Sequence, residues 1–190
     1  SPENQIATDK VWHELAFGLE SLGCDTPTIR RRVAEMASFF GIQEWFYKPV
    51  TELSGGQKQL LNLASVMVLQ PKVLILDEPT SQLDPIAASD FLATLGKINR
   101  ELGTTIILTE HRLEEAFGFA SRVAVMDGGK LLCTGTPAEV GAELKSSGNA
   151  MFLAMPAAMR IWAATDSHAA CPISVCDGRN WLLDYAKTHE

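Results

Sequence analysis

The chain has 190 residues, 46% of them hydrophobic, and a net charge of −7, which is ordinary for a globular protein with one domain or one domain and a small appendage. The acidic balance and the lack of a Lys/Arg-rich run argue against nucleic acid, so we expect no nucleic-acid partner. No apolar run reaches the roughly 18 residues that a membrane-spanning helix needs.

The first five residues are polar and acidic, and the chain starts without methionine. They do not have the pattern of a signal peptide. We therefore expect the chain to be a piece of a longer protein. Its four cysteines are scattered, which suits a reducing compartment. His168, Cys171 and Cys176 lie close in sequence, but their spacing matches no standard zinc pattern and a fourth ligand is not evident.

The first third of the chain is predicted to be helical. Apolar residues at helical spacing predict an amphipathic helix over 9–22, with Asp9 as its cap. A second helix is predicted over about 28–40, and a third over about 54–69. We group residues 1–70 as a helical subdomain.

Two buried strands are predicted next. The wholly apolar run Val73–Leu76 is typical of a strand covered on both faces in a parallel sheet, and residues 104–109 form a similar run. A helix over 86–101 separates them. Because strand, helix and strand form a crossover unit, the two strands should be parallel.

The remaining elements are shorter. A helix is predicted over 112–119, and residues 123–126 and 130–133 are predicted to form a hairpin. Pro137 should then start a helix that Thr136 caps.

We assign 71–148 to an α/β core with a parallel sheet. Residues 149–190 show weak periodicity and are interpreted as an appended segment or a linker.

Three features could carry chemistry. Asp77 and Glu78 follow an apolar strand, where ligands bind in open α/β sheets; an Asp can hold Mg²⁺ and a Glu can accept a proton from water. Ser54 begins a helix through two glycines, and such an N-terminus attracts phosphate. His111 follows the second strand and could contact a phosphate. Alone, each has an ordinary reading: a solvated acid pair, a capped helix, a structural histidine.

Together these segments are far more specific. Leu53–Gln57, Leu74–Glu78, Ser81–Asp84 and His111, in this order, resemble the signature loop, Walker B strand, D-loop and switch histidine of the ABC ATPase family. The resemblance covers roughly residues 1–145. It implies an α/β fold of the P-loop NTPase class with a helical subdomain.

The resemblance also implies roles, with ATP and Mg²⁺ as cofactors. Asp77 would serve Mg²⁺, Glu78 would polarise the attacking water, and His111 would contact the γ-phosphate. Such ATPases work as head-to-tail dimers, so the signature loop would meet the nucleotide of a second ABC ATPase domain, and Asp84 would act across that interface. The implied nucleotide-site residues are Ser54, Gly55, Gly56, Gln57 and Asp84.

The start of the chain resembles one branch of the family. Residues 1–5 and Trp12–Leu19 are similar to ATPase subunits of energy-coupling-factor transporters, which import cobalt, nickel or vitamins. This implies a transmembrane transporter subunit as partner and a location at the cytoplasmic face of the cell membrane. Residues 150–182 resemble the joining segment of versions with two cassettes.

The sequence also departs from the family. It has no Gly-x-x-x-x-Gly-Lys-Ser/Thr motif, and Gly128-Gly129-Lys130 fits a hairpin instead. The P-loop part is therefore expected to precede residue 1. Without its backbone and lysine the phosphates lose their main cradle, so we expect the isolated chain not to hydrolyse ATP. Leu60 and Gln82 stand where the family usually has arginine and a small residue.

Two other functions stay open at this point. The first is a soluble ABC ATPase of DNA repair or translation, against which the charge and the importer-like start argue. The second is a non-catalytic interaction module. Co-purification with a transmembrane subunit would separate the importer from the soluble ATPase.

Overall fold

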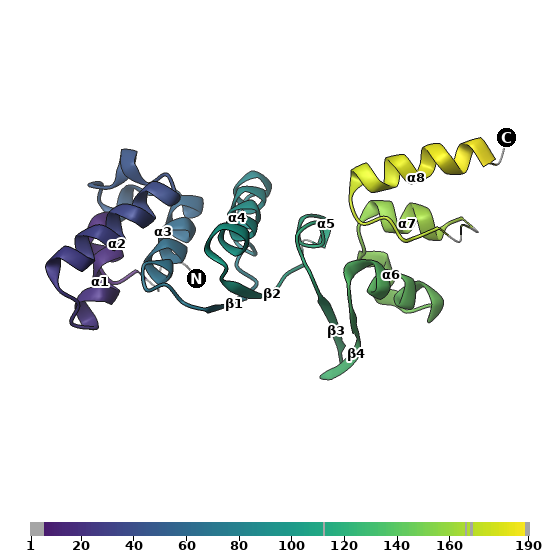
Figure 1. The fold of residues 1–190 in the computed structure, drawn as a ribbon, viewed down its shortest axis with the longest axis horizontal. Coiled ribbons are helices and arrows are strands. Elements are labelled where there is room, and N and C mark those ends of the chain that lie inside the picture. The colour runs from purple at the N-terminus through teal and green to yellow at the C-terminus, as the bar shows by residue number, and fades with distance from the viewer. Residues whose placement is uncertain (1–5, 112, 166, 168, 189–190) are drawn as a thin grey trace. The chain divides into compact units, whose positions relative to one another are not determined.

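The structure is a computed structural model that describes residues 6–111, 113–165, 167 and 169–188. These residues form two compact units, one up to Glu110 and one from His111 onward, and each is described by itself. The first unit holds three helices followed by a two-stranded sheet with its crossover helix. The second holds a hairpin and the remaining helices (Figure 1).

The helices of the first unit are α1 (Val11–Ser21), α2 (Thr26–Phe39) and α3 (Gly55–Met67), with 3₁₀ turns at Gln43–Trp45 and Val50–Glu52. The three predicted helices are thus confirmed. Helix α1 contacts both α2 and α3. Their shared core contains fully buried side chains: Val11, Leu15, Leu19, Ile42, Leu61 and Met67.

The predicted cap of α1 is wrong. Lys10, not Asp9, is the N-cap residue, and its side chain makes no capping bond. The chain before the helix is held by Glu14 instead, whose buried Oε2 accepts hydrogen bonds from the backbone N–H groups of Ala7 (3.1 Å) and Thr8 (2.9 Å). These bonds order the segment before α1, while the first N–H groups of the helix itself, those of Val11 and Trp12, donate to the carbonyl oxygens of Lys48 (3.2 Å) and Phe46 (3.1 Å).

The crossover unit consists of β1 (Val73–Asp77), α4 (Pro85–Lys97), a π-helical turn (Ile98–Leu102) and β2 (Thr105–Thr109). The two strands are parallel, as predicted, and the register places Asp77 opposite Thr109. Their last residues therefore meet at one edge of the sheet.

The prediction that these strands are covered on both faces is not met within the first unit. Ile75 is 71% exposed and Ile107 is 53% exposed, whereas Leu74 is buried. An apolar run shows that a strand is suited to burial, but a partner layer must be present to cover each face. None of the described residues forms a layer over the face of the sheet that carries Ile75 and Ile107.

The second unit begins with the short helix α5 (Leu113–Ala116), followed by β3 (Val123–Asp127) and β4 (Lys130–Gly135). The strands form the predicted antiparallel hairpin. Its turn residues Gly128 and Gly129 have φ values of 53° and 76°, which glycine adopts without strain.

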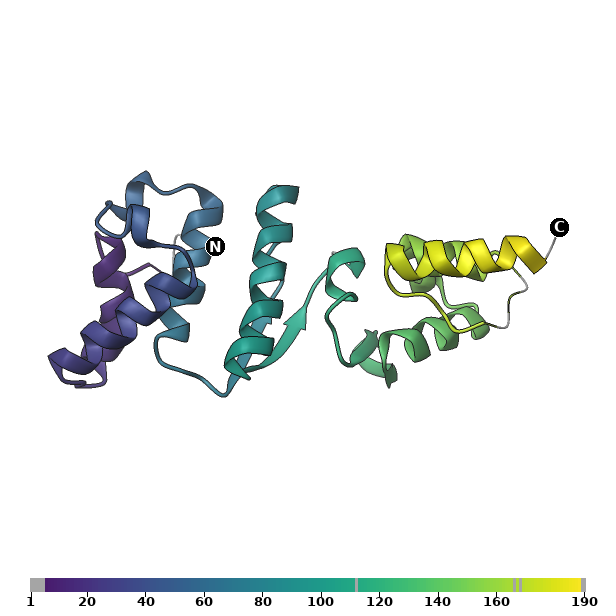
Figure 2. The same ribbon diagram turned by 45° about the horizontal axis from the view of Figure 1, so that its top comes forward.

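Helix α6 (Pro137–Ser146) starts as predicted, with Thr136 in a capping box with Glu139. A 3₁₀ turn (Ala150–Ala154), α7 (Ala157–Ala163) and α8 (Val175–Thr188) follow. Figure 2 shows α8 beside α7, which it contacts. The core of this unit is formed by Phe117, Val125, Cys133, Val140, Leu144, Met155, Met159, Trp162 and Cys171.

Candidate active site

The loop before α3 is a capping box. The Gln57 N–H donates to Ser54 Oγ (3.2 Å), and the Ser54 N–H donates to Gln57 Oε1 (3.0 Å). Both bonds order the helix start and satisfy backbone donors there. The exposed Ser54 thus stands at the positive end of a 13-residue helix.

The two glycines of this loop have different surroundings. A Cβ added at Gly56 would lie 3.2 Å from the Cβ of Ala87 in α4, whereas one added at Gly55 would meet nothing within 4 Å. Gly56 therefore permits the close packing of α3 on α4. Packing within the first unit does not require glycine at 55.

The carboxylates at the end of β1 are tied to the end of β2. Thr109 Oγ1 donates a hydrogen bond of 2.5 Å to Asp77 Oδ1. The Glu78 N–H donates to Thr109 O (3.1 Å) and to Thr109 Oγ1 (3.0 Å). Both carboxylate side chains are exposed. Glu78 has a φ of 44°, in the left-handed region that is uncommon for residues other than glycine.

The next two residues are held as well. Gln59 Nε2, on α3, donates to the carbonyl oxygen of Pro79 (3.0 Å). Thr80 is fully buried and its Oγ1 donates to Glu110 Oε1 (2.5 Å). The segment from Asp77 to Thr80 is thus fastened both to α3 and to the end of β2.

Asp84 is the N-cap residue of α4. Its Oδ1 accepts hydrogen bonds from the backbone N–H groups of Ile86 and Ala87, both at 3.0 Å. Since Ala87 lies against Gly56, the starts of α3 and α4 lie side by side. The exposed Asp84 and the signature loop therefore belong to the same neighbourhood of the first unit.

His111 is the first residue of the second unit, directly after Glu110, and it is exposed. Of the predicted site residues, the first unit therefore brings together the signature loop with Asp84, and Asp77 with Glu78. Sequence reasoning gave no role to Gln59, Thr80, Thr109 and Glu110. The predicted parallel pairing could have indicated Thr109, because the last residues of two neighbouring parallel strands lie at the same edge of the sheet.

The donor set at the end of β1 fits Mg²⁺. Asp77 is exposed, its carboxylate oxygens are hard ligands of the kind that Mg²⁺ prefers, and Oδ1 is held by the Thr109 hydroxyl. Within the described part of the chain, no group of three or more His, Cys, Asp or Glu side chains could hold a metal ion. His168, of the cysteine cluster considered above, lies outside the described residues.

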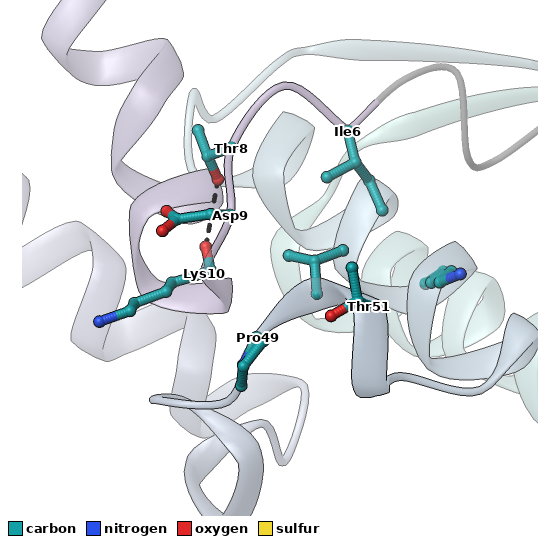
Figure 3. Close-up of a pocket in the computed structure, with 8 residues that line it drawn as sticks. Ile6, Thr8, Asp9, Lys10, Pro49 and Thr51 are labelled. Carbon is teal, nitrogen blue, oxygen red and sulfur yellow. Dashed lines mark hydrogen bonds between the residues drawn. The ribbon is translucent and has the colours of Figure 1, made fainter.

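A separate cavity of about 360 Å³ lies beside the start of α1 (Figure 3). None of the predicted site residues lines it. Its lining residues are Ile6, Thr8, Asp9, Lys10, Pro49, Val50, Thr51 and Lys58.

Comparison with known proteins gives consistent results. A family model described as ABC transporter matches residues 2–81. A Bacillus anthracis protein named as an ABC transporter ATP-binding protein is 53% identical over 144 residues, which are 76% of this chain and 26% of that protein. The chain therefore spans about a quarter of the length of that relative.

Two further relatives point to one kind of transporter. The energy-coupling factor transporter ATP-binding protein of Caldanaerobacter subterraneus is 42% identical over 145 residues, 76% of this chain and 52% of that protein. The structure of CbiO1 from Clostridium perfringens, described as part of the ABC transporter complex CbiONQ, aligns with a TM-score of 0.70 and 35% identity. The alignment covers 85% of this chain and 64% of that one.

The predicted fold class is confirmed by this structural likeness, together with the parallel pairing of β1 and β2. None of the described helices combines the length and the apolar character needed to cross a membrane. On these grounds the chain is related to ABC transporter ATP-binding proteins, and its relatives include energy-coupling-factor ATPases.

Proposed function

We propose that the complete gene product containing this chain is the ATP-hydrolysing subunit of an energy-coupling-factor type importer for a metal ion or vitamin. The observation that carries the proposal is the pair Asp77 and Glu78 at the end of β1, ordered by Thr109 at the end of the neighbouring parallel strand. The relatives support the transport branch of the family.

The residues divide the work as follows. Asp77 holds Mg²⁺, which neutralises phosphate charge when it is bound with ATP. Glu78 orients the attacking water and accepts its proton, and His111 donates a hydrogen bond to the γ-phosphate. The backbone N–H groups at the start of α3, with Ser54, contact the nucleotide of a second ABC ATPase domain in a head-to-tail dimer.

The wider setting follows from the same proposal. Gly55, Gly56 and Gln57 complete the contact with the partner's nucleotide, and Asp84 acts across the dimer interface. A transmembrane transporter subunit binds the ATPase at the cytoplasmic face of the membrane. Because the 190 residues contain no P-loop motif, the chain on its own does not hydrolyse ATP.

The test is magnesium-dependent ATP hydrolysis by the complete gene product. The Glu78→Gln variant keeps the size and the backbone bonds of residue 78 but removes the base, and we expect its kcat to fall by about 100-fold or more. Glu101→Gln is the matched control, because Glu101 is an exposed glutamate that precedes the start of β2, whereas the acid pair lies at the opposite end of the strand pair. An inactive wild type, or a Glu78→Gln variant as active as the control, would refute the proposal.

The transport part has its own test. The complete gene product, expressed in its native membrane, should co-purify with a transmembrane subunit and remain bound after a wash in high salt. An active ATPase that is recovered without any membrane partner would retain the hydrolysis assignment and reject the importer.

A further inference from the structure

We infer that Thr109 is a positioning residue for hydrolysis: its single hydroxyl sets the orientation of both Asp77 and Glu78. The inference rests on the function proposed above and extends it to a residue outside the predicted set. Thr109 Oγ1 donates to Asp77 Oδ1 at 2.5 Å and accepts from the Glu78 N–H at 3.0 Å. A hydroxyl has one proton, so the two bonds have complementary directions and can be made together.

The first bond fixes the carboxylate of Asp77. With Oδ1 turned toward β2, Oδ2 is left for a metal ion or its water shell. An exposed aspartate without such a partner samples several orientations, and only a part of them presents an oxygen to Mg²⁺. The hydroxyl therefore preorganises the metal ligand.

The second bond secures the backbone of Glu78. This residue has a φ of 44°, a conformation that persists where surrounding contacts enforce it. Its N–H also donates to the Thr109 carbonyl at 3.1 Å, a bond that any residue at position 109 would provide. The hydroxyl supplies the part of the restraint that depends on the side chain.

The hydroxyl is not needed for the strand itself. Position 109 is exposed, and valine has the same shape and suits a strand equally well. Thr105, at the other end of β2, is an exposed threonine whose backbone pairs in the same ladder. Thr105→Val is therefore the matched control: it makes the same chemical change in the same strand, but four residues away from Thr109.

The experiment measures kcat and KM for ATP, and the Mg²⁺ concentration for half-maximal rate, in the complete gene product. We expect Thr109→Val and Thr109→Ala to lower kcat by about 10-fold or more and to raise the Mg²⁺ requirement, with KM for ATP within about twofold. Thr109→Ser, which keeps the hydroxyl, should recover most of kcat. Thr105→Val should match the wild type.

The outcomes separate the two proposals. Wild-type activity in both hydroxyl-free variants overturns the role of Thr109, and so does a serine variant as slow as valine or a change confined to KM. If the wild-type protein itself does not hydrolyse ATP, the proposed function fails and the inference falls with it. Unfolding by urea, measured on each variant, identifies any loss of activity that comes from loss of fold.

Discussion

Asp84 has two separable tasks, one in folding and one in the proposed dimer. Its Oδ1 accepts two backbone N–H groups at 3.0 Å at the start of the 13-residue helix α4. Alanine removes both bonds, and loss of an N-cap side chain costs about 1–2 kcal/mol. Asparagine keeps the accepting oxygen and loses only the charge at the helix start, worth about 0.3–1 kcal/mol at an exposed site.

We therefore expect Asp84→Ala to lower the free energy of unfolding of the first unit by about 1–2 kcal/mol, and Asp84→Asn by less than about 1 kcal/mol. Urea unfolding measures the change in the free energy of unfolding, and amide hydrogen exchange over residues 85–97 shows whether the loss of stability is in α4. Equal destabilisation by the two substitutions, or none by alanine, would refute the capping argument.

The variants Asp84→Ala and Asp84→Asn also test the proposed role of Asp84 in ATP hydrolysis. In the complete gene product, Asp84→Asn should slow ATP hydrolysis although α4 stays capped, if Asp84 acts through its charge across the interface as proposed above. Hydrolysis at the wild-type rate in Asp84→Asn, combined with slow hydrolysis in Asp84→Ala, would mean that residue 84 acts only by holding the helix.

Three further outcomes follow from the structure. Gly55→Ala should leave the free energy of unfolding in urea within about 0.5 kcal/mol of the wild-type value, because its added Cβ enters open space, but it should reduce the ATPase activity of the complete gene product. Gly56→Ala places its Cβ 3.2 Å from Ala87, so it should be less stable than Gly55→Ala in the same unfolding assay. Met159→Ala, at a fully buried site, should destabilise the second unit by about 2–5 kcal/mol in thermal or urea unfolding. Burial raises the pKa of the Cys171 thiol from 9.0 to about 11, so the unfolded chain loses this proton first and the free energy of unfolding should fall as pH rises between these values. Burial also raises the pKa of the Cys133 thiol, so Cys171→Ala should show a smaller decline than the wild type, and a decline equal to that of the wild type would contradict the assignment.

Features that depend on neighbouring residues in sequence could be predicted well. The caps at Ser54 and Thr136, the glycine turn at Gly128 and the pairing of β1 with β2 all follow from local pattern and chain connection. The signature loop and the acid pair at the end of β1 were likewise recognisable from residue type and order.

Features that depend on distant contacts could not. Asp9 has the better capping chemistry, but Lys10 is the N-cap residue, and the first helical N–H groups donate to the distant carbonyl oxygens of Phe46 and Lys48. The bond of Gln59 to Pro79 joins residues 20 positions apart, and no local pattern indicates it. The bond of Thr109 to Asp77 joins residues 32 positions apart; the predicted parallel pairing brings the two strand ends together, but the register and the bond itself come from the structure. Ile75 is likewise exposed because none of the residues that the structure describes covers this face of the sheet, which its sequence neighbours do not indicate.

The open face of β1 and β2 has a practical consequence for work with the isolated chain. Val73, Ile75 and Ile107 are all more than half exposed, and an uncovered strand pair offers hydrogen-bonding edges to other chains. The net charge of −7 keeps the molecules apart, but the Debye length is only about 10 Å at 0.1 M salt. Storage in dilute, low-salt buffer should therefore preserve the chain in solution, while added salt should promote its precipitation.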